Sequence, residues 1–163
     1  GVCNAMETLL IHKSFSKKCL KKILSTYSEN NVEIRGCRNI KKLHPVAKLA
    51  QEKDWSEEFL SPIISVKIVE SLNEAIEHIT KYGSLHTDAI VSDDKGSINQ
   101  FKKLINSSSV MVNTSTRFAD GYEYGLGAEI GISTDKLHAR GPVGLDGLTN
   151  LKYIVTSKGK IRS

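Results

Sequence analysis

A regular alternation of β-rich runs and helical segments over residues 62–113 constrains the fold of this chain more than any other feature. The runs at 62–69, 89–92 and 110–113 are short and rich in Ile and Val, which is typical of buried strands. Apolar residues at helical spacing fill both intervals between these runs. Because strands that are joined by helices usually run parallel, we predict an α/β domain with a mostly parallel sheet flanked by helices.

The helices of this region carry local start and stop signals. Ser71 and Glu74 have the spacing of a capping box, in which two side chains accept hydrogen bonds from free backbone N–H groups. This box predicts an amphipathic helix that ends at Gly83. A further helix is predicted over residues 98–105.

The first 35 residues give a less regular pattern. Asn4 can cap a short helix, which we predict over residues 5–10. Helical spacing of apolar residues then predicts a longer helix that starts near Ser16 and is stopped by Asn30. Residues 32–35 alternate in polarity and predict a short strand.

Beyond residue 113 the chain changes character, since seven of its twelve glycines lie between residues 114 and 148. Glycine lets the backbone approach a ligand closely, so this stretch is a candidate binding loop. Residues 151–155 are apolar apart from Lys152 and predict a terminal strand. The length of 163 residues fits one ordinary domain.

Composition excludes several classes of protein. With 39% hydrophobic and 25% charged residues the chain is typical of a globular protein, and its apolar runs are far shorter than the roughly 20 residues of a membrane span. The net charge of +5 comes largely from lysines at 13–22 and in the tail. Because such a run is typical of a solvated helix face and no recognisable nucleic-acid module is visible, we predict no nucleic-acid partner. The positive field would help to attract an anionic substrate.

The three cysteines are Cys3, Cys19 and Cys37. Their odd number and the absence of metal-type spacing argue against a disulfide framework or a zinc site, and favour a reducing, cytoplasmic compartment. Cys3 precedes the helix predicted over residues 5–10, whose free N–H groups would favour a thiolate. Spacing alone leaves open whether Cys3 is a nucleophile or a small buried residue.

Several long blocks of sequence resemble the γ-glutamyl phosphate reductases, a family of the aldehyde dehydrogenase superfamily. The blocks occur in family order, and together they are far more specific than any single short motif. They are VCNAMETLLIH at 2–12, AIEHI at 75–79, YGSLHTDAI at 82–90, VNTSTRFADG at 112–121, YGLGAEIGIST at 124–134 and LHARGPVGL at 137–145. The resemblance implies an aldehyde dehydrogenase-like catalytic domain over residues 1–150, in a fragment that starts at the active-site cysteine segment.

The resemblance implies that Cys3 is the catalytic nucleophile. Its thiolate would attack the acyl carbon of γ-glutamyl phosphate and expel phosphate, and the backbone N–H of Cys3 would help to hold the oxyanion. Reduction of the thioacyl enzyme by NADPH would give glutamate 5-semialdehyde for proline biosynthesis. Glu58 and Phe59 resemble the superfamily element that contacts the nicotinamide ribose. Most of the NADPH contacts are expected from a preceding domain, so the chain alone should have little or no activity.

Arg117 is the candidate for holding the substrate, because a guanidinium can grip a carboxylate or phosphate with two parallel hydrogen bonds. A local ion pair of Arg117 with Asp120 or Glu123 is the alternative. Further substrate-binding candidates share a polar side chain near a predicted strand; they are Asn113, Ser115, Thr116 and His86. His86 can also be a hydrogen-bonded core histidine.

Residues 151–163 are predicted to be a tail strand that returns to the cofactor domain or forms a contact in a homo-oligomer. Glutamate 5-kinase is a candidate partner, either separate or fused to the reductase. Two other functions stay open. The chain can belong to another acylating aldehyde dehydrogenase, or it can be an inactive fragment that acts as a binding or assembly module. Among the loop residues, Glu129 is expected to be structural, and Arg140 to fix the loop.

Overall fold

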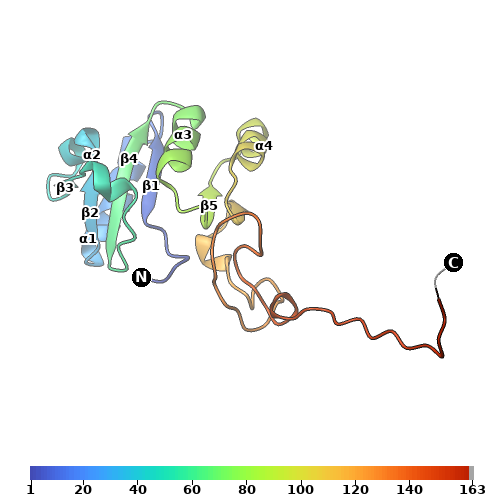
Figure 1. Ribbon diagram of the computed structural model, residues 1–163. Coiled ribbons are helices and arrows are strands. Elements are labelled where there is room, and N and C mark those ends of the chain that lie inside the picture. Colours follow the sequence, from blue (N-terminus) through green and yellow to red (C-terminus); the bar gives the residue numbers. More distant parts are fainter. Residues whose placement is uncertain (162–163) are drawn as a thin grey trace.

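The computed structural model describes residues 1–161 and has an α/β fold (Figure 1). The strands are β1 Thr8–His12, β2 Glu33–Gly36, β3 Lys48–Leu49, β4 Ile63–Val69, β5 Thr87–Ile90 and β6 Ser109–Val112. The helices are α1 Lys17–Glu29, α2 Arg38–Leu43, α3 Leu72–Tyr82 and α4 Lys95–Leu104, with 3₁₀ turns at Glu52–Trp55, Thr116–Phe118 and Asp146–Leu148.

All the paired strands named above run parallel. Four of them form a sheet in the order β1-β4-β2-β3, and β5 pairs with β6 in a second, two-stranded sheet. Thr8 of β1 lies opposite Ser65 of β4, so the N-terminal strand is held by a partner more than fifty residues away in the chain. The predicted mostly parallel sheet with flanking helices is confirmed.

The helix ends follow the local signals in the sequence. The Ser16 hydroxyl accepts from the backbone N–H of Cys19 at the start of α1, and the Ser71 hydroxyl accepts from that of Glu74 at the start of α3. The capping box is only half formed, because the Glu74 carboxylate accepts instead from the backbone N–H of Glu70, at 2.7 Å. α3 ends at Gly83, as predicted.

The helix predicted over residues 5–10 is wrong, because Thr8–His12 is strand β1. Helix propensity is a local preference, whereas β1 is stabilised by hydrogen bonds to β4, and tertiary pairing of this kind overrides propensity. The backbone N–H of Ser65, for example, donates to the carbonyl of Glu7 at 2.8 Å. The described residues directly after Cys3 therefore form no helix, and no helix N-terminus favours a thiolate at this position.

The buried apolar residues form two clusters. The larger one lies between the four-stranded sheet and helices α1 and α2, and includes Leu24, Ile40 and Val66, each 0% exposed. The smaller one joins α3 and α4 around Phe101, which is 2% exposed. The first cluster fixes the sheet whose edge strand, β1, leads back to Cys3.

A buried histidine lies beside the larger sheet. His78 of α3 is 6% exposed, and its ring centroid lies 5.2 Å from that of Trp55 and 4.7 Å from that of Tyr82. Within residues 1–161 its Nε2 atom has no hydrogen-bond partner. Burial, and secondly the nearby Lys67 ammonium group, lower the pKa of His78 to about 4.

This histidine makes the stability of the fold sensitive to acid. The unfolded chain takes up a proton at His78 below about pH 6.5, whereas the folded protein does so only near pH 4. The free energy of unfolding is therefore expected to fall by up to about 3 kcal/mol as the pH drops through this window. Urea denaturation of wild type and His78→Leu at pH 7 and pH 4.5 measures it. The variant should lose most of this pH dependence, and His138→Leu, at an exposed site, should keep it. Equal pH dependence in wild type and His78→Leu would contradict the assignment.

The tail leaves the body of the molecule as an extended chain (Figure 1). Residues 151–161 form no strand, and Tyr153, Ile154 and Val155 are 84%, 77% and 90% exposed. A strand forms only when its backbone groups have a partner. The predicted pairing of this tail with another domain or subunit stays a prediction. Residues 162–163 of the predicted tail lie outside the described residues. None of the described helices is long and apolar enough to cross a membrane.

Candidate active site around Cys3

Cys3 lies exposed in the turn that leads into β1. The turn is closed by a hydrogen bond from the backbone N–H of Ala5 to the carbonyl of Val2, at 2.9 Å. Cys3 opens onto a cavity of about 250 Å³, which it lines together with His86, Glu129 and residues of the 131–142 segment. The fold therefore brings two sequence-predicted site residues, Cys3 and His86, to one cavity.

Asn4 anchors the cysteine turn to a segment far away in the sequence. Its side chain is 7% exposed, and its Nδ2 group donates to the carbonyls of Arg117, at 3.3 Å, and Ala119, at 3.1 Å. In return, the Thr116 hydroxyl donates to the carbonyl of Asn4 at 2.7 Å. These reciprocal hydrogen bonds fix the backbone next to Cys3 against the 3₁₀ turn at Thr116–Phe118.

Three of the predicted substrate-binding side chains are occupied with local structure. The Thr116 hydroxyl holds Asn4, and the Ser115 hydroxyl accepts from the backbone N–H of Arg117 and caps the 3₁₀ turn. Asn113 has a φ of 54°, and its side chain bonds both the N–H and the carbonyl of Ser92. These contacts shape the turn beside Cys3, and a direct role of the three side chains in binding substrate stays a prediction.

Arg117 is exposed and is held by its backbone on the same turn. Within the described part of the chain its guanidinium makes no hydrogen bond or ion pair, so the local pairing with Asp120 or Glu123 is not found. The side chain does not line the cavity of Cys3, although the carbonyl of Arg117 is bound by the neighbour of that cysteine. A ligand that contacts Cys3 and the Arg117 guanidinium would thus break no ion pair within the described residues.

His86 is half-buried at the start of β5. Its Nδ1 atom lies 2.7 Å from the Thr87 hydroxyl, and its carbonyl accepts from the Ser108 hydroxyl and the Ser109 backbone N–H. The backbone is thereby fixed, and His86 is one of the residues that line the cavity. Arg140 ties its loop to the segments before β5 and β6, because its Nη2 group donates to the carbonyls of Leu85, at 3.4 Å, and Asn106, at 2.9 Å. The predicted loop-fixing contact of Arg140 is present.

The predicted cofactor element lies beside the cysteine segment. The backbone N–H of Phe59 donates to the Glu7 carboxylate at 3.0 Å, and the Arg35 guanidinium lies 4.9 Å from the centroid of the Phe59 ring. Burial raises the pKa of Glu7, against the lowering effect of the Phe59 N–H. Glu58 is exposed. A carboxylate and an aromatic ring next to a thiol segment fit the contacts of a nicotinamide riboside.

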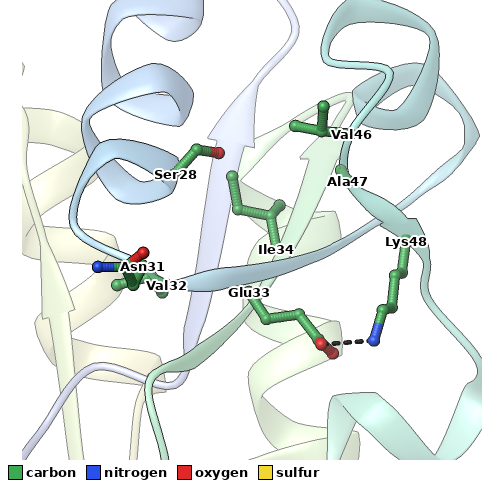
Figure 2. A pocket seen from close by; sticks show the side chains of 8 residues that line it. All are labelled: Ser28, Asn31, Val32, Glu33, Ile34, Val46, Ala47 and Lys48. Atoms are coloured by element: carbon green, nitrogen blue, oxygen red, sulfur yellow. Dashed lines mark hydrogen bonds and ion pairs between the residues drawn. The ribbon is translucent and has the colours of Figure 1, made fainter.

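A second cavity, of about 380 Å³, lies beside β2 and β3, away from Cys3 (Figure 2). The Glu33 carboxylate and the Lys48 ammonium group lie 2.5 Å apart on one side of it. Its one side-chain hydroxyl, that of Ser28, is bonded to His44 at 2.8 Å. Because it contains no thiol and no free hydroxyl, Cys3 and its cavity are the better candidate site.

The sequence did not single out Asn4 as an anchor or Glu129 as a cavity residue. Both lie in the blocks of resemblance, yet neither contact could be read from local spacing. No group of three or more His, Cys, Asp or Glu side chains within residues 1–161 is arranged to bind a metal ion. The titratable residues among those that line the cavity are Cys3, His86 and Glu129.

Comparison with known proteins finds solved structures that match the chain, and no family model matches it. A γ-glutamyl phosphate reductase from Thermotoga maritima is 43% identical, with a TM-score of 0.89, over 100% of this chain and 39% of its own length. One from Saccharomyces cerevisiae is 34% identical, with a TM-score of 0.54, over 99% of this chain and 36% of its own.

An acetylating aldehyde dehydrogenase from Geobacillus thermoglucosidasius shares the fold. Its identity to the chain is 15%, and its TM-score is 0.61 over 99% of this chain and 45% of its own length. At this identity the likeness speaks for the architecture alone. The α/β fold of the chain is thus aldehyde dehydrogenase-like, and the chain spans less than half the length of each of these three structures.

Proposed function

The chain resembles the γ-glutamyl phosphate reductases in sequence and in fold, and on this resemblance we propose that the protein reduces L-glutamate 5-phosphate to glutamate 5-semialdehyde with release of phosphate. The observation that carries the proposal is the placement of Cys3. Its turn is anchored by Asn4 and opens onto a cavity that also contains His86. In a cell this reaction would serve proline biosynthesis.

Cys3 supplies the covalent step. Its Sγ atom forms a bond to the acyl carbon of the substrate, the bond from that carbon to the phosphate oxygen breaks, and phosphate leaves with the electron pair. The product is a thioester on Cys3. The developing oxyanion is held by backbone N–H groups, among them that of Cys3, and fixed donors of this kind favour the transition state.

NADPH, when bound, supplies the hydride that converts the acyl group to the aldehyde. Within this chain Glu58 and Phe59 are the residues that would hold its nicotinamide end, because Glu7 fixes their backbone beside the cysteine segment. Arg117 would hold an anionic group of the substrate through its free guanidinium, and His86 would donate to the same or a second anion. Asn113, Ser115 and Thr116 set the shape of the turn that carries Arg117.

The chain spans only 39% of the length of the Thermotoga structure. The reductase activity is therefore proposed for a longer protein that contains this chain. Alone it should show little or no turnover. The exposed tail is proposed to pair with the cofactor domain or with another subunit of a homo-oligomer, because residues 151–161 form no strand and their apolar side chains are exposed. Glutamate 5-kinase remains the candidate partner protein, and the cytoplasm the proposed compartment.

The proposal is tested by the dependence of the reverse reaction on phosphate. A purified enzyme that contains this chain should oxidise glutamate 5-semialdehyde with NADP⁺ only when inorganic phosphate is present, as followed by the absorbance of NADPH. A requirement for coenzyme A instead would favour another acylating aldehyde dehydrogenase. Absence of turnover with either acceptor would favour a binding or assembly module.

Thr116 offers a test of how Cys3 is positioned. In the enzyme that contains this chain, Thr116→Val is expected to lower kcat about tenfold and to leave KM for the semialdehyde unchanged. The substitution removes the hydrogen bond to the carbonyl of Asn4, and a less firmly held Cys3 slows the chemical step. Thr116→Ser should retain kcat. Thr80→Val removes a similar hydrogen bond, from a hydroxyl to the carbonyl of Ile76, at a distant site and should leave kcat unchanged. A rise in KM with constant kcat would make Thr116 a substrate ligand instead.

A further inference from the structure

We propose that Glu129 is a specificity-determining residue, whose carboxylate receives the α-ammonium group of the glutamyl substrate beside Cys3. The identity of that substrate rests on the proposed function. The negative charge beside Cys3 can be tested without the substrate and without the proposed activity.

Glu129 faces the same cavity as the nucleophile. Among the described residues that line this cavity of about 250 Å³, Cys3, His86 and Glu129 are the titratable ones, and Glu129 is the only carboxylate. No Lys or Arg side chain lines it. Glu129 is exposed, and within residues 1–161 its carboxylate makes no hydrogen bond or ion pair, so it is available to a ligand.

The backbone of Glu129 is held in place from two sides. A Cβ atom on Gly121 would lie 2.7 Å from the Cβ atom of Glu129 and 3.0 Å from the carbonyl of Gly127, so only glycine permits this close approach. The next residue, Ile130, exchanges backbone hydrogen bonds of 3.0 and 3.1 Å with Val143. These contacts fix the backbone and the Cβ atom of Glu129 at the wall of the cavity.

Thr134 fixes the segment that follows. Its hydroxyl donates to the carbonyl of Ser84 at 2.9 Å, which joins this wall of the cavity to the segment that leads to His86. The cavity walls are thus linked to each other by hydrogen bonds. A ligand that enters between Cys3 and Glu129 meets a preformed pair of groups.

An unpaired carboxylate is unfavourable next to a thiolate and to a substrate that carries a phosphate and a carboxylate, because like charges repel at short distance. The substrate proposed above has one cationic group, its α-ammonium. Pairing with that group removes the repulsion, whereas an analogue without it would leave the carboxylate unpaired. Glu129 thus selects for the amine and also against substrates that lack it.

The charge beside Cys3 is measured on the chain itself with thiol reagents of opposite charge. A cationic and an anionic methanethiosulfonate, carrying trimethylammonium and sulfonate groups, react with Cys3 at rates followed by site-resolved mass spectrometry at low ionic strength. Glu129→Gln is expected to lower the ratio of cationic to anionic rates at Cys3 by about three- to tenfold. The matched control Glu123→Gln, an exposed neighbour outside the cavity, should leave this ratio unchanged. Cys19 provides an internal reference in each protein.

The preference for an amine is measured in the enzyme that contains this chain. The ratio of kcat/KM for glutamate 5-semialdehyde to that for 5-oxopentanoate, which lacks the amine, should fall at least about tenfold in Glu129→Gln. An unchanged thiol-reagent ratio would overturn the proposal whatever the enzyme does. A changed thiol-reagent ratio with an unchanged amine preference would overturn the ammonium assignment. Lack of phosphate-dependent turnover with either aldehyde would overturn the proposed function and the ammonium assignment together, while the thiol-reagent ratio would still report the charge beside Cys3.

Discussion

Turnover by the enzyme that contains this chain is expected to fall by about 10⁴-fold or more when Cys3 is replaced by serine. The reaction needs a nucleophile that forms an acyl intermediate, and a serine hydroxyl without an adjacent general base is a far weaker nucleophile than a thiol. Because Cys3 is exposed and its turn is anchored by Asn4, the substitution is expected to leave the fold intact. Steady-state rates of NADPH formation in the phosphate-dependent reverse reaction measure the effect.

Cys19→Ser is the matched control for this substitution. Cys19 is also an exposed free cysteine, but it lies on α1. It should retain the wild-type rate within about twofold, as expected for a surface change away from the site. Denaturation curves of both variants should match wild type. Retention of activity in Cys3→Ser would place the nucleophile elsewhere in the protein.

Leu24→Ala is expected to lower the free energy of unfolding by about 3 kcal/mol. Leu24 is 0% exposed in the cluster between α1 and the four-stranded sheet, so its truncation leaves a cavity that the packed neighbours cannot fill. Urea denaturation at pH 7 measures the change.

Leu104→Ala provides the comparison, because Leu104 also lies on a helix but is 50% exposed. It should cost less than about 1 kcal/mol, since the side chain loses little apolar contact. Equal losses in the two variants would mean that the cluster around Leu24 does not dominate the stability of the fold.

Local signals account for the elements that the sequence predicts well. Ser16, Ser71 and Gly83 act within a few residues of the helix ends that they define, so α1 and α3 could be placed without tertiary information. Strands β4 and β6 have compact Ile- and Val-rich runs. β1 could not be predicted in the same way, because its strand conformation depends on pairing with β4, and the residues before it had supported a helix.

In the candidate site, too, some residues could be found from the sequence, whereas others depend on tertiary contacts. Cys3 and His86 were found through the resemblance of their blocks, and they share a cavity because the fold brings the blocks together. The anchoring role of Asn4 and the placement of Glu129 depend on contacts with Thr116 and Gly121, which no spacing rule links. Substrate-binding residues predicted from polarity alone proved to be engaged, since polar side chains in tight turns commonly satisfy the backbone.

The bonds of Asn4 also set an order of assembly during synthesis. Asn4 is 113 residues from Arg117 and 115 residues from Ala119, the two carbonyls to which its side chain donates. A ribosome that has just made the cysteine turn must therefore extend the chain through the whole α/β body before that turn can be anchored. At typical elongation rates of about 5–20 residues per second, Cys3 spends several seconds or more on a nascent chain without these contacts. The most reactive group proposed for this protein is thus made well before the contacts that hold its turn can form.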